Sequence, residues 1–407
     1  MSIVVAWSML ALTLVMGVLP IFLSIRFGQR LNQLRALPVV RQNHKVAIIL
    51  PCKGLDPGFR ENIMSWLNQE LDNAMLVFVV ATADDPAYFA ISKLIEETRG
   101  TVRQSDVVLL VANIENVRAQ KITNQLAAIS HLGSKPDILV FVDSDIRPLP
   151  DMVSRLIAPL EDTGVGATTG IRWYDPPTPT LGSMLRSTWT AGALPMVVDP
   201  RTNFAFGGCM ACKRTVFERA RIAERWDRAV SDDFPFTLGI KELGLEVRFV
   251  PACTVVSYES STVAETIEFT NRQSIISRIY FPSLWWMAAL AHSSTNILLL
   301  YGLVSFVFWC ASGSMAALIG SFCCLLLVLQ MANAWLLIHK AQDLMPQLRK
   351  KLQLLLPHYM IAAPLTTLLS LVNTLYSLTT NRITWRGVCY EMRSPSETIV
   401  ISSDNQK

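Results

Sequence analysis

The sequence predicts an α/β domain with a mostly parallel sheet, joined at both ends to helices that cross a membrane. Between residues 45 and 258, short β-rich runs alternate with amphipathic helical stretches. Such alternation is typical of a parallel sheet covered by helices on both faces. Outside this region, residues 2–25 and 279–339 contain no Asp, Glu, Lys or Arg. Because a span needs about 20 apolar residues, the first stretch predicts one membrane helix and the second predicts two.

The predicted strands and helices of the domain follow one another in a regular order. In sheets of this kind ligands bind beyond the carboxyl ends of the strands, so the residues after each strand are the candidates for a site. Neither G-x-G-x-x-G nor G-x-x-x-x-G-K-[ST] occurs, which argues against a dinucleotide-binding or P-loop domain. The predicted strands are 46–50, 75–80, 107–112 and 138–142, and the predicted helices are 59–71, 88–97 and 120–131.

The apolar segments also predict an orientation. Residues 2–25 lack the basic start and the small-residue exit of a cleaved signal peptide, so we expect an uncleaved anchor. The two predicted spans in 279–339 join near residues 311–314, where no charge occurs. Basic residues lie next to the spans on the cytoplasmic side of a membrane. The domain is therefore expected to be cytoplasmic, because the basic residues follow the first and third spans: Arg26, Arg30, Arg35, Arg41 and Lys45, then Lys340, Arg349, Lys350 and Lys351.

The overall composition agrees with an integral membrane protein. Hydrophobic residues make up 51% of the 407 residues and charged residues 17%, below the roughly 25% of soluble domains. The net charge of +4 is too small and too dispersed to indicate a nucleic-acid partner, so none is expected. The basic residues next to the predicted spans suit anionic lipid headgroups. Eight Cys without paired spacing, in a cytoplasmic context, indicate buried apolar residues or free thiols and not a set of disulfides. Cys209 and Cys212 have no second C-x-x-C pair, so zinc is not expected.

Asp143-Ser144-Asp145 directly follows the strand at 138–142. Side chains two apart on an extended chain share a face, so both carboxylates can approach one hard cation. Mg²⁺ and Mn²⁺ prefer oxygen ligands and are commonly held by carboxylates together with substrate phosphates. The pattern therefore predicts a divalent metal site at Asp143 and Asp145. The alternative is a solvated loop or a helix cap, which Asp and Ser also favour.

Two further acidic pairs allow two interpretations each. Asp84-Asp85-Pro86 follows the second strand, where it is either a ligand site or an Asp-Pro turn that starts a helix. Asp232-Asp233 precedes an amphipathic helix, where it is either an N-cap or the source of a general base for an acceptor hydroxyl.

Taken together, these segments make the chain resemble glycosyltransferase family 2, and most closely its ceramide glucosyltransferase branch. The resemblance covers nearly the whole chain and implies a GT-A domain, which has a Rossmann-like, mostly parallel sheet. The order and spacing of the matching segments are more specific than any one of them: Pro51-Cys52-Lys53-Gly54-Leu55-Asp56-Pro57, Asp84-Asp85-Pro86-Ala87, Lys121 with Asn124, Asp143-Ser144-Asp145, Ser231-Asp232-Asp233, and Trp385-Arg386-Gly387 with Tyr390.

The resemblance implies roles for single residues. Asp85, with Asp84 beside it, would contact the uridine of a UDP-sugar. Asp143 would lie at the metal and the diphosphate, with Asp145 as its partner. Asp233 would be the catalytic base, with Asp232 as the alternative. Lys53, Lys121, Trp385 and Arg386 would complete the nucleotide-sugar site.

One motif of the family is altered. The usual [QR]-x-x-R-W corresponds here to the run from Arg272 to Arg278, where Ile275 and Ile276 replace Arg-Trp. Gln273 or Arg278 would then supply the polar contact to the diphosphate, or Arg272 and Arg278 would only meet lipid headgroups. We expect Ile275 and Ile276 to form an apolar entrance for a lipid.

The resemblance implies an inverting transferase that moves a hexose onto a lipid hydroxyl. The hexose it suggests is glucose, supplied by UDP-glucose. Ceramide is the acceptor it suggests, and diacylglycerol or another hydroxylipid is the alternative. A processive polysaccharide synthase would normally need the intact motif and more spans. A non-catalytic membrane scaffold would fit the altered motif but not three preserved acidic sites.

The predicted domain organisation follows from these assignments. Residues 352–378 are apolar but contain Pro357 and Pro364, and a full crossing would carry residues 385–390 away from the cytoplasmic site. We therefore expect a broken segment that is interfacial or re-entrant. The predicted parts are an anchor at 1–25, a basic linker at 26–45, the GT-A domain at 46–280, the membrane region at 281–379, and a tail with the Trp-Arg-Gly motif at 380–407.

Overall fold

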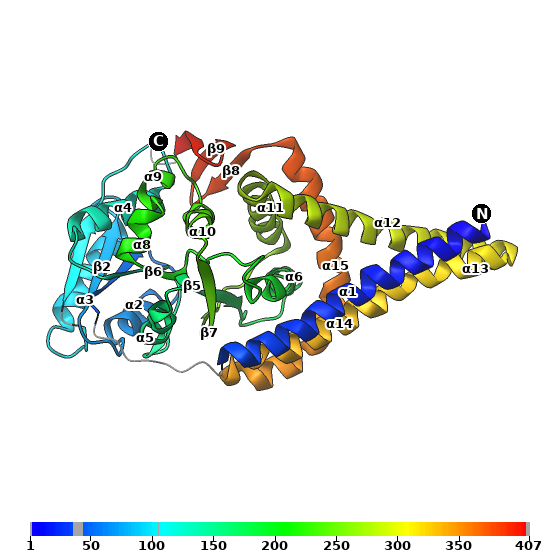
Figure 1. The fold of residues 1–407 in the computed structure, drawn as a ribbon, viewed down its shortest axis with the longest axis horizontal. Helices are drawn as coiled ribbons and strands as arrows, with labels where there is room; N and C mark the ends of the chain where they lie inside the picture. The colour runs from blue at the N-terminus through cyan, green and yellow to red at the C-terminus, as the bar shows by residue number, and fades with distance from the viewer. Residues whose placement is uncertain (1, 36–43, 105, 404–407) are drawn as a thin grey trace. The chain divides into compact units, whose positions relative to one another are not determined.

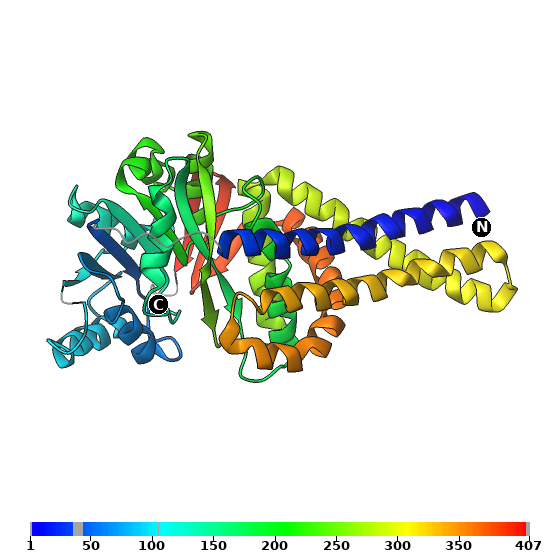
Figure 2. The same cartoon turned by 60° about the horizontal axis from the view of Figure 1, so that its bottom comes forward.

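The computed structural model describes residues 2–35, 44–104 and 106–403, which fold into two compact units (Figures 1 and 2). Of the described residues, the sheet unit contains 31–35, 44–104, 106–175, 196–258 and 381–403. The helical unit contains 2–30, 176–195 and 259–380. Residues 176–195 and 259–280, which we expected within the GT-A domain, thus belong to the unit with the apolar helices.

Within the described residues, the sheet unit contains a seven-stranded sheet in the order β3-β2-β1-β4-β6-β5-β7 (Figure 1). β6 is antiparallel to both β4 and β5, and the other pairs are parallel. The sheet is therefore mostly parallel, as the sequence predicts. Its strands are β1 (Val46–Pro51), β2 (Ala74–Val80), β3 (Val107–Val111), β4 (Ile138–Val142), β5 (Val165–Tyr174), β6 (Cys209–Lys213) and β7 (Glu246–Ser257).

Helices cover both faces of this sheet, which is why the central strands are continuous apolar runs. On one face Ile48 and Val140 pack in a core with residues of α2, α3 and α5. On the other face the ring of Phe141 lies 5.2 Å from Trp226 and 6.0 Å from Phe217, centroid to centroid. The helices of this unit are α2 (Phe59–Leu67), α3 (Pro86–Glu97), α4 (Gln120–Leu132), α5 (Met152–Ile157), α8 (Arg214–Arg219), α9 (Ile222–Arg225) and α10 (Asp233–Glu242), with a 3₁₀ turn at Ala158–Glu161.

The strand order places a switch point between β1 and β4. After β1 the chain moves outward to β2 and β3, and it then returns to form β4 on the other side of β1. Ligands bind in the crevice outside the carboxyl ends of the strands at such a point. The segments that follow β1 and β4 contain Lys53 and Asp143, so the sequence-predicted candidates lie at this edge.

A small C-terminal sheet belongs to the same unit and was not predicted. Its strands are β8 (Arg382–Trp385), β9 (Val388–Ser394) and β10 (Glu397–Ser403), in the order β10-β9-β8. Trp385 pairs with Val388, so Arg386 and Gly387 form a two-residue turn. Their φ angles are +47° and +79°. Positive φ at both central residues is the mark of a type I′ hairpin turn, and at Arg386 it is unusual for a residue with a Cβ.

Four helices of the helical unit are long and apolar enough to cross a membrane, counting the described residues only: Ile3–Arg35, Pro282–Ser312, Met315–Ala341 and Pro346–Thr379. α1 runs beside α14 in both views, and the Ser24 hydroxyl donates to the Asn333 Oδ1 at 2.8 Å (Figures 1 and 2). The helices are α1 (Ile3–Arg35), α6 (Leu181–Ala191), α7 (Leu194–Val197), α11 (Val263–Tyr280), α12 (Pro282–Ser312), α13 (Met315–Ser321), α14 (Leu325–Ala341) and α15 (Arg349–Thr379), with 3₁₀ turns at Phe322–Cys324 and Pro346–Leu348.

The helix α15 corrects one expectation, because no break occurs at Pro357 or Pro364. Each proline removes only one backbone donor, and neighbouring helices support the segment. The Tyr359 hydroxyl lies 2.8 Å from the Ser187 hydroxyl of α6. Asn373 accepts a hydrogen bond of 3.2 Å from Thr270 of α11. Tertiary packing therefore holds one continuous helix where the sequence predicted an interruption.

The chain segments that make up the sheet unit limit how many of the long helices can cross a membrane. Residues 44–104 and 196–258, which precede α12 in the sequence, and residues 381–403, which follow α15, belong to this one unit. Within it, Arg386 donates to the Lys53 carbonyl oxygen at 3.1 Å. An odd number of crossings between them would place these two groups on opposite sides of a membrane. α15 packs against α11, which carries Glu268 and Arg272, and charged residues are costly in hydrocarbon. We therefore predict that α12 and α13–α14 cross and that α15 lies at the interface.

Cysteine labelling tests this topology. In a chain with the three cysteines that are not buried, Cys310, Cys324 and Cys389, replaced by Ser, one new Cys is placed at Ser312 or at Ser396, which are both exposed. In sealed vesicles that keep the orientation of the cell, an impermeant maleimide should label Ser312→Cys from outside. It should label Ser396→Cys only after permeabilisation. Labelling of Ser396→Cys from outside would mean that α15 crosses completely.

Candidate active site

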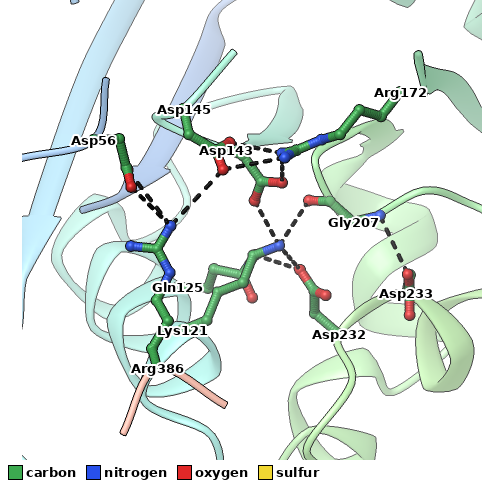
Figure 3. A network of polar contacts seen from close by, with 10 residues as sticks. All are labelled: Asp56, Lys121, Gln125, Asp143, Asp145, Arg172, Gly207, Asp232, Asp233 and Arg386. Atoms are coloured by element: carbon green, nitrogen blue, oxygen red, sulfur yellow. Dashed lines mark hydrogen bonds and ion pairs between the residues drawn. The ribbon is translucent and has the colours of Figure 1, made fainter. Parts of the chain in front are cut away.

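Acidic and basic side chains from separate segments meet at the carboxyl edge of the sheet (Figure 3). We call them the carboxylate cluster. Asp143 and Asp145 follow β4, Lys121 comes from α4, and the remaining groups come from β5, the start of α10, the loop after β1 and the β8–β9 turn. The cluster consists of Asp56, Asp143, Asp145, Asp232, Asp233, Lys121, Arg172 and Arg386.

Lys121 lies at the centre of this cluster. Its ammonium lies 2.9 Å from the Asp143 Oδ1 and 3.0 Å from the Asp232 Oδ2, and it donates to the Gly207 carbonyl oxygen at 3.1 Å. Three acceptors therefore match the three N–H groups of the ammonium. Burial alone would lower the pKa of Lys121, but the charges of Asp143 and Asp232 outweigh it and raise that pKa above its usual value.

Arg172, from β5, joins the two carboxylates of Asp143-Ser144-Asp145. Its Nη2 lies 2.7 Å from the Asp143 Oδ2 and 2.6 Å from the Asp145 Oδ1, while its Nη1 donates to the Asp145 Oδ2 at 3.1 Å. Burial would raise the pKa of Asp143, but Lys121 and then Arg172 lower it to about 2. Asp143 is therefore ionised at any physiological pH.

The two neighbouring carboxylates at the start of α10 have different surroundings. Asp232 is buried and accepts from the Gln125 amide at 2.8 Å as well as from Lys121. Asp233 accepts from the Ser231 hydroxyl, from the Phe234 N–H at 2.8 Å and from the Gly207 N–H at 3.5 Å. Over residues 44–104 and 106–403 the structure gives Asp233 no ion pair. Burial, and next the charge of Asp232, raise the pKa of Asp233 to about 6.

Gly207 and Gly208 let these carboxylates approach the backbone. A Cβ on Gly208 would lie 2.3 Å from the Asp143 Oδ2, and a Cβ on Gly207 would lie 2.4 Å from the Asp232 Oδ1. The segment is fixed by the antiparallel pairing of β4 with β6, and the Asp143 N–H donates to the Gly208 carbonyl oxygen at 3.2 Å. A Cβ at either position would therefore displace the carboxylate beside it.

The β8–β9 turn brings the predicted Trp-Arg-Gly motif to the cluster. Arg386 lies 3.4 Å from the Asp56 carboxylate and 3.8 Å from the Asp145 Oδ2. Lys53 donates to the Arg386 carbonyl oxygen at 2.7 Å. The motif thus lies beside Lys53 and Asp145. Contacts of these residues with a nucleotide-sugar stay a prediction.

Asp85 serves as the N-cap of α3, which was one of its two interpretations. Its Oδ1 accepts from the Ala87 N–H at 2.9 Å and from the Gly54 N–H at 2.8 Å, so it also holds the loop after β1. Asp84 is exposed. Asn124 donates to the Val79 carbonyl oxygen at 3.0 Å, at the end of β2. A contact of Asp84 or Asp85 with the nucleobase stays a prediction.

The residues of the altered motif lie on α11 in the helical unit. Arg278 donates to the Thr380 carbonyl oxygen at 3.2 Å, and the Arg272 guanidinium lies 5.6 Å from the Phe269 ring centroid. Contacts of Arg272, Gln273 and Arg278 with a diphosphate stay a prediction. Ile275 and Ile276 are buried, so they do not form the exposed apolar entrance that we expected. On this helix they pack inside the unit instead.

The carboxylate oxygens of the cluster are the type of ligand that divalent cations prefer. In the described part of the chain, no group of three or more His, Cys, Asp or Glu residues is placed to hold a metal. Asp143 and Asp145 nevertheless converge on one nitrogen of Arg172, as two carboxylates sharing a cation would. The cluster also contains five carboxylates but three cationic groups, so it has a deficit of positive charge when all are ionised. Mg²⁺ and Mn²⁺ are commonly bound by one or two carboxylates completed by substrate phosphates.

Sequence reasoning missed Arg172 of the cluster and several residues that contact the cluster. Arg172 is an arginine inside a strand whose ten residues are all buried, and a charge in such a run is a signal that could have marked it. Gln125 and the Gly207-Gly208 pair had no comparable signal, because their importance depends on contacts across the fold.

Comparisons with known proteins give one family match. Residues 6–398 match the model described as "Glycosyl transferase family 21". The curated proteins contain no match. A mannosyltransferase from Pyrobaculum calidifontis, solved with GDP-Man and Mn²⁺, is 15% identical with a TM-score of 0.47, covering 91% of this chain and 98% of that one. Glucosyl-3-phosphoglycerate synthase from Mycobacterium tuberculosis, solved with Mn²⁺ and UDP-glucose, is 14% identical with a TM-score of 0.37, covering 60% of this chain and 81% of that one.

The close approach of Gly208 to the Asp143 carboxylate predicts the effect of one added methyl group. Gly208→Ala should displace the Asp143 carboxylate and lower sugar transfer at least about a hundredfold, since a small misplacement in a site has effects of this size. Gly164→Ala is the matched control, because its Cβ would make an ordinary contact of 3.4 Å on an exposed loop. Initial rates of both variants are compared with the parent. Equal rates for Gly208→Ala and Gly164→Ala would refute the close approach.

Proposed function

Because the match extends over residues 6–398, the chain belongs to glycosyltransferase family 21, and we propose that it transfers a hexose from a nucleotide-sugar donor to a membrane lipid hydroxyl. The family is thus 21 and not the family 2 that the motifs suggested. Membership makes the chain a glycosyltransferase, which removes the scaffold interpretation. Within this activity we propose UDP-glucose as donor and ceramide as acceptor, with diacylglycerol as the alternative acceptor.

The observation that supports this proposal best is the environment of Asp233. Asp143, Asp145 and Asp232 each form an ion pair, whereas Asp233 forms none among the described residues. The charge of Lys121 lowers the pKa of Asp233 only in part, so burial and Asp232 prevail. The resulting pKa of about 6 suits a general base near neutral pH, because the carboxylate is ionised and still basic enough to accept a proton. Asp233 is therefore our choice over Asp232, which is held by Lys121 and Gln125.

The proposed reaction is a single in-line displacement. The Asp233 carboxylate takes the proton of the lipid hydroxyl, whose oxygen attacks the anomeric carbon and forms the new glycosidic bond. The bond from that carbon to the diphosphate oxygen breaks, so the configuration inverts. Lys121, Arg172 and Arg386 supply positive charge near the diphosphate as its negative charge grows. A divalent cation held by Asp143 and Asp145 would neutralise further charge on the leaving group.

The apolar helices support a lipid acceptor. Four of them are long and apolar enough to span a membrane in the described chain, and a lipid hydroxyl is presented at the membrane surface. A soluble acceptor would leave these helices without a role in catalysis. A processive polysaccharide synthase remains as an outcome of the test below.

The proposal is tested by lipid analysis in a host that makes no glycolipids. Expression of the chain should produce a lipid with one added hexose, identified by mass spectrometry. Asp233→Asn keeps the shape of the side chain but removes the proton acceptor, so the rate should fall about 10²–10⁴-fold while UDP-glucose still binds. Asp72→Asn, at an exposed surface carboxylate, is the control and should keep full activity.

Three results would contradict parts of this proposal. Near-normal transfer by Asp233→Asn would show that another group is the base. Products with long sugar chains would support the polysaccharide synthase. The absence of any hexosylated lipid, with UDP released in a purified assay, would mean that the acceptor is not a lipid of that host.

A further inference from the structure

We propose that Arg172 is a built-in counter-ion that competes with the divalent cation for Asp143 and Asp145. The inference rests on the proposed function, because it concerns the order in which cation and donor bind. In the structure one nitrogen, Nη2 of Arg172, lies within 2.7 Å of an oxygen of each carboxylate. A cation that binds both aspartates needs the same oxygens.

Arg172 is held in this position from several sides. Arg172 is 9% exposed. Its guanidinium carbon lies 5.6 Å from the ring centroid of Phe206 and 6.0 Å from that of Tyr174. Cations are attracted to aromatic faces at such distances. These contacts hold the guanidinium at the two carboxylates, so it competes with a cation more strongly than a mobile surface charge would.

The other two cations of the cluster are less suited to compete. Lys121 is shared with Asp232 and the Gly207 carbonyl oxygen, and it contacts Asp143 through the opposite oxygen, Oδ1. Arg386 lies 3.8 Å from Asp145 and is closer to Asp56. Arg172 alone in the described cluster contacts both Asp143 and Asp145 at hydrogen-bonding distance.

Binding of the nucleotide-sugar donor would end the competition between Arg172 and the cation. A guanidinium pairs with phosphate through two parallel hydrogen bonds, so a bound diphosphate offers Arg172 a partner as good as the carboxylates. When Arg172 turns to the diphosphate, the oxygens of Asp143 and Asp145 become available to the cation. The cation is then expected to bind weakly alone and tightly with the nucleotide.

Manganese binding without any sugar transfer tests this inference. The free Mn²⁺ signal in electron paramagnetic resonance is recorded during titration of the detergent-solubilised full chain, with and without UDP. Without UDP, Arg172→Gln should bind Mn²⁺ at least about tenfold tighter than the parent, because it removes a charge-assisted bond to the ligands. Arg172→Lys keeps the charge but loses the planar fork that contacts both carboxylates, so it should bind Mn²⁺ less tightly than Arg172→Gln. With UDP, the difference between Arg172→Gln and the parent should shrink.

The opposite results would overturn the inference. Equal or weaker Mn²⁺ binding by Arg172→Gln without UDP would show that Arg172 does not compete. Equal tightening in Arg172→Lys and Arg172→Gln would show that charge is not the cause. If Arg172→Gln is not recovered folded, Phe206→Leu keeps the charge and removes one supporting ring, and it should bind Mn²⁺ about threefold tighter. Parent-like affinity of Phe206→Leu would then refute the inference.

The outcome is separate from that of the proposed function. Mn²⁺ binding is read without a sugar or a lipid, so a chain that fails to glycosylate lipid can still show or lack the competition. A chain that glycosylates lipid while Arg172→Gln leaves Mn²⁺ binding unchanged would refute this inference alone.

Discussion

The rest of the site depends on the ion pairs that the Lys121 ammonium forms with Asp143 and Asp232. The ammonium binds Asp143 at the end of β4 and Asp232 before α10, two segments that would otherwise place buried negative charges side by side. Removing one partner of a buried ion pair costs about 3–5 kcal/mol, because the remaining charge has no compensation. The glycines at 207 and 208 belong to the same arrangement, since any larger residue would occupy the space of the two carboxylates.

The ion pairs of Lys121 give the neighbouring aspartates different pKa values. Asp143 has its pKa lowered to about 2 by the cations around it, whereas burial and Asp232 raise the pKa of Asp233 to about 6. Carboxyl groups whose pKa values are pushed apart take different roles in a reaction. In our proposal the low-pKa group binds the cation and the diphosphate, and the high-pKa group accepts the proton of the lipid hydroxyl.

Part of this architecture could be predicted from the sequence. The strands from β1 to β4 are continuous apolar runs, and acidic groups follow them at the edge where a parallel sheet binds ligands. Arg172 and Gly208 were not found, because their contacts join residues far apart in the chain. The continuous α15 was missed for a related reason: Pro357 and Pro364 predict a break locally, but packing on α6 and α11 supports the helix.

The dependence of kcat on pH tests the central claim most directly, that Lys121 neutralises Asp232 and Asp143 and leaves Asp233 as the base. Below its pKa the Asp233 carboxyl is protonated and cannot accept a proton, so kcat should fall about tenfold per pH unit below about pH 6. Asp232→Asn removes a charge that raises this pKa, and the acid limb of its residual activity should move to lower pH. An acid limb near pH 4 in the parent, or the same limb in Asp232→Asn, would contradict the account.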